Sequence, residues 1–164
     1  MLVPEISLTA QIVNKFYSHF GNDVAIFHSG LSNGEKYDEY LKILRDEVHI
    51  VVGTRSAIFT PLTNLGIIII DEEHSETYKQ DSNPRYHSLD MATFRSKYHH
   101  IPIVLGSATP SLETMARALK GVYKYIEMPN RIGSSTLPKV EIIDMDEKMK
   151  KRNICKFVDK ESSS

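Results

Sequence analysis

Short apolar runs alternate along the chain with stretches in which apolar positions recur every three or four residues. Each run is continuous, which is typical of strands that are covered on both faces of a parallel sheet. The pattern predicts strands at residues 24–29, 49–54, 66–71, 101–109 and 123–128. The opening stretch "MLVPEI" has the pattern of the last residues of a further strand. This alternation predicts an α/β fold with a parallel sheet and helices on both faces.

The stretches between the runs predict helices at residues 8–20, 32–44, 88–98 and 110–121. Gly21 is expected to end the first helix, and Ser32 with Glu35 forms a capping box at the start of the second. Pro110 suits the first turn of the fourth helix and Gly121 the position beyond its end. The apolar faces of the first two helices are predicted from Leu8, Ile12, Phe16, Phe20, Tyr37, Leu41 and Leu44.

Composition places the chain among globular proteins and excludes several classes. Of 164 residues, 41% are hydrophobic and 25% charged, and the net charge of −1 provides no general attraction to nucleic acid. The single cysteine, Cys155, excludes an intrachain disulfide and a cysteine-based zinc site within this chain. No apolar run is long enough to cross a bilayer, and no signal peptide pattern is present. These features predict a cytoplasmic protein without membrane contact.

The run "IIII" of residues 67–70 continues directly into "DEEH", residues 71–74. In open parallel sheets, ligands bind beyond the carboxyl ends of the strands, so Asp71 is expected to emerge at the ligand edge. A carboxylate there suits a magnesium ion, which prefers hard oxygen ligands. Glu72 can orient or deprotonate a water that attacks a phosphate. Taken alone, the four residues fit a solvated turn equally well, because short motifs recur by chance.

Three other segments accompany this cluster. "VPEISLT" (3–9), "VVGTRSAIFTP" (51–61), "DEEH" and "GSATPS" (106–111) occur in the order of motifs Ia, Ib, II and III of superfamily 2 helicases. Together with "HSGLS", "GTRSAIFTPLTNLGIIIIDEEHSETYKQ", "RYHSLD" and "IPIVLGSATPSLET", they are similar to the PriA family of primosomal replication-restart helicases. The resemblance covers about residues 2–143, and several of its segments are long enough to make chance matching improbable.

The resemblance implies a RecA-like, P-loop NTPase domain of three layers. Residues 1–143 would form part of the first helicase lobe, and residues 144–164 a linker or disordered tail. It further implies that Asp71 holds magnesium together with a bound nucleotide and that Glu72 polarises the hydrolytic water. His74 would pass the state of the nucleotide to Ser107 and Thr109.

The resemblance also implies contacts with the DNA backbone, at Pro4, Glu5, Thr9, Gly53, Thr54, Arg55 and Ser56. A Gly-Thr-Arg-Ser turn suits phosphates through close backbone approach, hydroxyls and a forked guanidinium. The alternative is an ordinary strand-to-helix connection. The loop after the acidic cluster mixes aromatic and cationic side chains, which suit stacking on single-stranded bases, and it resembles an aromatic-rich loop of the family. Its candidates are Tyr78, Lys79, Arg85 and Tyr86; the alternative is that both tyrosines pack against the next helix.

The phosphate-binding pattern G-x-x-x-x-G-K-[ST] is absent from the chain. In the family this phosphate-binding loop precedes the "VPEI" segment. The chain is therefore expected to be a fragment that lacks the P-loop strand, binds ATP weakly and does not hydrolyse it. The parent would be an ATP-dependent 3′-to-5′ helicase that restarts stalled forks, with a zinc-binding region elsewhere. Its expected partners are forked and single-stranded DNA, single-stranded DNA-binding protein and other primosome proteins.

Two other functions are compatible with parts of the sequence. One is a non-catalytic module that binds DNA or protein. The other is a serine hydrolase, because "GLSNG" (30–34) fits a nucleophile elbow in which Ser32 would need Asp71 and His74 or His87 as partners.

An unpaired sheet edge is also expected at residues 101–105. If the P-loop strand that normally lies beside this segment is missing, its backbone groups stay open to another chain. We therefore expect the fragment to self-associate there, or to cover the edge with residues 148–164.

Overall fold

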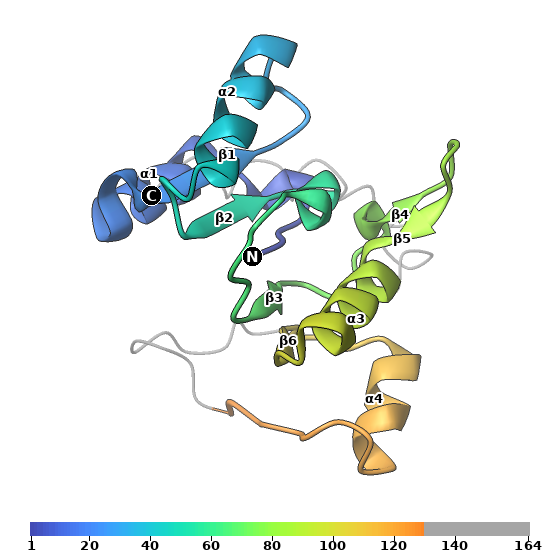
Figure 1. Ribbon diagram of the computed structural model, residues 1–164. Coiled ribbons are helices and arrows are strands. Elements are labelled where there is room, and N and C mark those ends of the chain that lie inside the picture. Colours follow the sequence, from blue (N-terminus) through green and yellow to red (C-terminus); the bar gives the residue numbers. More distant parts are fainter. Residues whose placement is uncertain (130–164) are drawn as a thin grey trace, which may run out of the picture. The chain divides into compact units, whose positions relative to one another are not determined.

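The structure is a computed structural model that describes residues 1–129 (Figure 1). The chain divides into two compact units, Met1–Tyr125 and Ile126–Ser164, and the architecture below is that of the first unit. The predicted boundary after residue 143 and the predicted tail lie outside the described residues. None of the described helices combines the length and the apolar character needed to span a membrane.

A parallel sheet forms the centre of the first unit (Figure 1). Its strands are β1 (Val24–Phe27), β2 (Ile50–Gly53), β3 (Ile68–Ile70) and β6 (Ile103–Leu105). β1 pairs with β2 and β3 pairs with β6. Leu2 makes parallel bridges to both Gly53 and Ile70, so the opening segment lies between β2 and β3 as the pattern of "MLVPEI" predicts. The strand order is therefore β1, β2, the Leu2 segment, β3 and β6.

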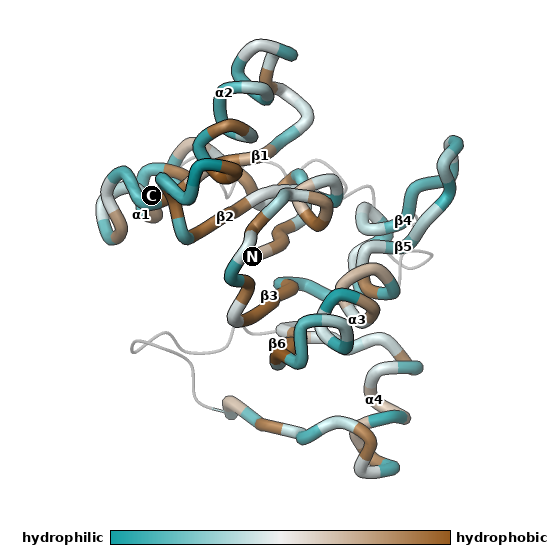
Figure 2. Tube along the Cα trace, in the orientation of Figure 1, coloured by the Kyte–Doolittle hydropathy of each residue, from teal (hydrophilic) through white to brown (hydrophobic). Residues whose placement is uncertain are grey.

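Helices cover both faces of this sheet, as expected. The four α-helices are α1 (Ala10–Phe20), α2 (Asn33–Leu44), α3 (Ser88–His99) and α4 (Leu112–Leu119). Val13 and Phe16 of α1 pack with Val24 and Val52 in one apolar cluster. Ile43 of α2 and Ala92 of α3 belong to a second cluster, which also contains β-strand side chains. Figure 2 shows the strands as apolar segments at the centre of the unit.

Short elements connect these strands and helices. The 3-10 helices are η1 (Glu5–Ser7), η2 (Gly21–Asp23), η3 (Arg55–Phe59) and η4 (Glu76–Tyr78), and β4 (Lys79–Gln80) pairs antiparallel with β5 (Tyr86–His87). The hairpin of β4 and β5 is largely hydrophilic (Figure 2). It lies between η4 and α3 in the sequence.

Capping residues set the helix boundaries. The capping box at Ser32 and Glu35 is confirmed, with Glu35 N–H to Ser32 Oγ at 3.3 Å and Ser32 N–H to Glu35 Oε2 at 2.8 Å. Gly21 follows α1 with φ 59°, a conformation that favours glycine. The fourth helix begins later than predicted, because Ser111 is its N-cap and Pro110 precedes the cap.

Two predictions from the pattern are wrong. The buried side chain of α2 is Ile43, whereas Tyr37 and Leu44 are 62% and 49% exposed, because the helix presents a different face to β1. The strand predicted at residues 123–128 does not form. Within the described residues no strand pairs with that stretch, and Tyr125, Ile126 and Met128 are exposed. An apolar run alone therefore did not suffice for a strand there.

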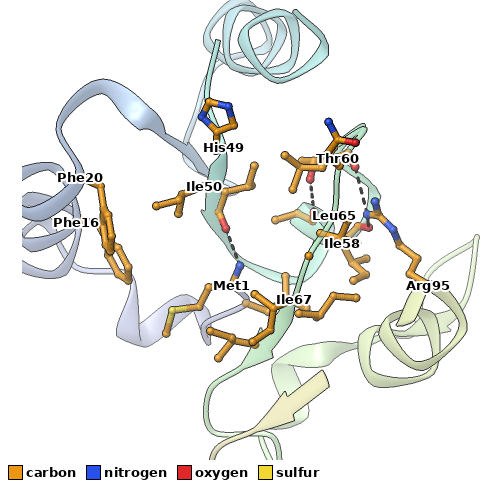
Figure 3. Close-up of a pocket in the computed structure, with 18 residues that line it drawn as sticks. Met1, Phe16, Phe20, His49, Ile50, Ile58, Thr60, Leu65, Ile67 and Arg95 are labelled. Atoms are coloured by element: carbon orange, nitrogen blue, oxygen red, sulfur yellow. Dashed lines mark hydrogen bonds between the residues drawn. The ribbon is translucent and has the colours of Figure 1, made fainter. Parts of the chain in front are cut away.

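The amino ends of the strands border a cavity of about 430 Å³ (Figure 3). Apolar side chains such as Ile50, Leu65 and Ile67 dominate its lining. The Met1 ammonium donates to the Val51 carbonyl at 2.7 Å, and burial lowers its pKa to about 6. Arg95, which also lines the cavity, donates to the carbonyls of Ile58 and Thr60 and so fixes η3 against α3.

Candidate functional site

The polar segments singled out in the sequence follow strands that run parallel. Gly53 ends β2, Asp71 follows β3, and Ser107 follows β6 by two residues. Because β2 and β3 both run parallel to the Leu2 segment and β6 runs parallel to β3, these positions share one edge of the sheet. The predicted common edge is confirmed.

The acidic segment turns sharply at this edge. Asp71 N–H donates to the Leu2 carbonyl at 3.0 Å, and its Oδ1 accepts from Glu72 N–H at 3.0 Å. Glu72 has φ 47°, in the left-handed region where side chains with a Cβ are disfavoured. The Ser75 N–H closes the turn on the Glu72 carbonyl at 2.8 Å. Strain of this kind is frequent at functional sites.

His74 joins this turn to the segment after β6. Its Nδ1 lies 2.7 Å from Ser107 Oγ, and its Nε2 lies 3.4 Å from Thr109 Oγ1. The Thr109 N–H donates to Ser107 Oγ at 3.1 Å, and the Glu72 carboxylate lies 3.6 Å from His74 Nδ1. The structure thus brings together all five residues to which the helicase resemblance assigns chemistry or coupling.

Tyr78 occupies a position that the sequence did not indicate. Its side chain is 1% exposed, and its hydroxyl donates to the Asp71 carbonyl at 2.6 Å. Burial, with smaller contributions from the charges of Asp71 and Glu72, raises the pKa of this phenol well above its ordinary value. A ring buried to this degree has no free face for a base, so the predicted stacking role does not fit this conformation. Tyr78 instead stabilises the turn at Asp71 through this hydrogen bond.

Arg55 also forms hydrogen bonds within the protein, although it is half-exposed. Its guanidinium donates to the Lys79 carbonyl at 2.6 Å and to the Thr77 carbonyl at 3.4 Å. The Ser88 hydroxyl donates to the Arg55 carbonyl at 3.4 Å. This arginine therefore joins the turn after β2 to the loop that follows the acidic segment, and it connects two of the segments predicted to contact DNA.

The other predicted DNA-binding residues divide by exposure. Exposed side chains, available for direct contact, belong to Glu5, Thr9, Ser56, Lys79 and Arg85, whereas Pro4, Gly53 and Thr54 are buried. At Gly53, an added Cβ would lie 2.3 Å from the Phe27 carbonyl oxygen, so glycine is required for packing. Thr9 caps α1 by accepting from Ile12 N–H at 3.4 Å.

The hairpin residues are held by local contacts. Lys79 pairs with Asp81 at 3.1 Å, and Arg85 Nε donates to the Asp81 carbonyl at 3.0 Å. The Tyr86 ring packs edge-on against Phe59, with ring centroids 4.9 Å apart, which leaves it half-buried. The alternative prediction is that both tyrosines pack against the next helix; the contacts described here join Tyr78 to the Asp71 carbonyl and Tyr86 to Phe59.

The serine-hydrolase alternative has no support in the geometry. Ser32 Oγ accepts from Glu35 N–H as a helix cap. His74 contacts Ser107, and His87 Nδ1 accepts from Leu89 N–H at 3.2 Å. Within residues 1–129, no hydrogen bond joins Ser32 to a histidine, so the nucleophile–base pair that an elbow requires is not formed.

The donor set at this edge suits a magnesium ion held together with a nucleotide. Asp71 and Glu72 provide half-exposed carboxylates, and no group of three or more His, Cys, Asp or Glu residues within 1–129 forms a closed metal cage. Magnesium keeps several waters and is usually bound through one or two carboxylates plus substrate phosphates. Asp71 is the residue that would hold it.

Comparisons with known proteins agree with the site. The family model of the DEAD/DEAH box helicases matches residues 1–118. The chain is 55% identical over 157 residues to the replication restart protein PriA of Bacillus subtilis, which covers 96% of this chain and 20% of that protein. It is 49% identical to the PriA of a Synechocystis species (93% of this chain, 19% of the relative) and 44% identical to that of Chlamydia trachomatis (92% and 20%). The chain thus spans about a fifth of the length of these curated relatives. With the helicase model matched over most of its length and the expected residues gathered at one sheet edge, the chain belongs to the DEAD/DEAH box helicase family.

Proposed function

We propose that this segment is part of the first lobe of an ATP-dependent 3′-to-5′ DNA helicase that acts in replication restart. The observation that supports the proposal best is the bond of 2.7 Å between His74 and Ser107, because it joins the acidic turn to the segment after the next strand. The similarity to replication restart proteins points to the same process.

Each residue of the edge has a task in this proposal. Asp71 would hold magnesium together with a bound nucleotide, and the ion would supply positive charge for the phosphates. Glu72 orients the attacking water and accepts its proton, and its carboxylate lies 3.6 Å from His74 Nδ1. His74 lies between Glu72 and the two hydroxyls of Ser107 and Thr109, so a shift of either side displaces the imidazole.

DNA contact is assigned to the exposed members of the predicted set. Lys79 and Arg85 in the hairpin and Ser56 after β2 offer cations and a hydroxyl for phosphates. Arg55 and Tyr78 position this loop: Arg55 connects it to the turn after β2, and Tyr78 connects it to Asp71. The parent's expected partners are forked and single-stranded DNA, single-stranded DNA-binding protein and other primosome proteins.

Strand displacement by a longer protein that carries this segment tests the proposal. Forked DNA with a 3′ single-stranded tail should be unwound with ATP and magnesium, and a substrate with only a 5′ tail should not. Asp71→Asn should abolish unwinding, because the metal loses its charged ligand. Unwinding without ATP, or from the 5′ tail alone, would contradict the proposal.

A further inference from the structure

Glu73 is a buried carboxylate whose role neither the helicase resemblance nor the proposed chemistry explains. Its residue is 4% exposed, although its neighbours Glu72 and His74 are much more open. The ion pairs formed within residues 1–129 do not include it. A buried charge is costly unless hydrogen bonds satisfy it, so its partners define its function.

The partners of the Glu73 side chain all lie at the start of α4. Oε1 accepts from Ser111 N–H at 2.7 Å, and Oε2 accepts from the Thr114 hydroxyl at 3.0 Å. The Ser111 hydroxyl lies 3.2 Å from Oε2 and 3.0 Å from the Thr114 hydroxyl, and its single proton serves one of them at a time. The positive end of the helix dipole adds a favourable term for a carboxylate at this place.

The backbone of Glu73 is held to the same segment from the other side. Its N–H donates to the Gly106 carbonyl at 3.0 Å. Residues 106–111 are therefore bonded to the acidic turn at both of their ends, through Gly106 and through Ser111. The segment between them contains Ser107 and Thr109, the two hydroxyls that contact His74.

We propose that Glu73 is a positioning residue that locks α4 to the acidic turn, so that α4 and the contacts of His74 with Ser107 and Thr109 move as one unit. The exposed face of α4, which includes Leu112 and Leu119, would then follow any movement of the turn. That this movement reports nucleotide hydrolysis rests on the proposed function, whereas the mechanical link itself does not.

Nuclear magnetic resonance of the full chain tests the link without nucleotide or DNA. In Glu73→Ala, amide hydrogen exchange at Ser111 should accelerate at least about tenfold, because its N–H loses the carboxylate oxygen that accepts its hydrogen bond. The side-chain nitrogen resonances of His74 should shift, since Ser107 and Thr109 lose one of their two anchors. Glu73→Gln keeps one acceptor oxygen for Ser111 N–H and should restore much of the slow exchange.

Glu113→Gln is the matched control, because it removes an exposed carboxylate from the first turn of the same helix. This substitution should change the rate of amide hydrogen exchange at the start of α4 by less than about threefold and leave the His74 resonances in place. Thr114→Val removes one donor to Glu73 and should shift the same signals by a smaller amount, which also serves if Glu73→Ala does not fold. Unchanged His74 resonances in the folded variants, or equal exchange in Glu73→Ala and Glu73→Gln, would overturn the proposal.

Discussion

The two edges of the central sheet consist of the same strands but are stabilised differently. At the amino edge, mainly apolar side chains line a cavity of about 430 Å³, together with Met1 and Arg95 (Figure 3). At the carboxyl edge, polar side chains bond to one another and to backbone groups, and Glu72 adopts a left-handed backbone. Burial therefore dominates at one edge, whereas oriented hydrogen bonds dominate at the other.

This difference implies that different residues determine the stability of the fold and the chemistry of the site. Fully buried apolar side chains of the sheet lose packing when they are truncated, and that loss is large and does not depend on ligands. Asp71, Glu72 and Ser107 at the carboxyl edge are half-exposed, so their truncation should cost little stability and much activity. Substitutions on the two sides should consequently give opposite ratios of stability loss to activity loss.

The largest expected effect on stability is at the core of the sheet. Ile70→Ala removes a side chain that is 1% exposed and should lower the free energy of unfolding by about 2 to 5 kcal/mol. Ile67→Ala, at 47% exposure three residues earlier, is the control and should cost less than about 1 kcal/mol. Urea denaturation of both variants measures the difference, and equal losses would show that β3 is not buried as described.

The next effect is a pH dependence at the amino edge. Burial lowers the pKa of the Met1 ammonium from its ordinary value near 8.0 to about 6, so the unfolded chain holds this proton between these values and the folded chain does not. Stability should therefore rise with pH from 6 to 8, by about 2 to 3 kcal/mol in total. An Nα-acetylated chain lacks the titrating group. Parallel denaturation curves for the two chains across this window would contradict the assignment.

Relief of backbone strain at the carboxyl edge should give a smaller change, a gain in the free energy of unfolding. Glu72→Gly relieves a positive φ and should stabilise the chain by about 1 kcal/mol. His100→Gly, at φ 55° after α3, should give a similar gain and serves as the matched control away from the site. In a longer protein only Glu72→Gly should lose hydrolysis. A destabilised Glu72→Gly beside a stabilised His100→Gly would show that the Glu72 side chain supports the fold.

The smallest effect concerns the outer strand. Among the described residues β6 pairs with β3 alone, and Val104 is 46% exposed. We propose that this edge recruits a second copy of the chain, which light scattering should show as a mass that rises with concentration. Val104→Lys should reduce the association, since a charged side chain blunts an open edge. A monomer at all concentrations would refute this proposal.

The parts that the sequence predicted well are those in which one local signal suffices. Continuous apolar runs located the strands β1, β2, β3 and β6, and Ser32 with Glu35 located the start of α2. The common edge of Asp71, Gly53 and Ser107 follows from parallel strands alone. Agreement between several such local signals is what made the fold predictable.

The parts that it missed depend on tertiary partners. The buried face of α2 includes Ile43 because of how the helix lies on β1, which a repeat of apolar positions does not specify. From the sequence alone, Tyr78 is an aromatic residue of a polar loop. Only the structure shows that its hydroxyl donates to the Asp71 carbonyl. Glu73 offered one clue, a third carboxylate in a motif that uses two, but its partner Ser111 lies 38 residues away.

Hydrolysis by Glu72→Gln tests the central claim, that the acidic turn is a hydrolytic site, most directly. In a longer protein that carries this segment and a phosphate-binding loop, the steady-state rate should fall by about 10² to 10⁴. ATP affinity should stay within about threefold of the wild type, because Asp71, the proposed metal ligand, remains. A variant that binds ATP and hydrolyses it at the wild-type rate would contradict the account.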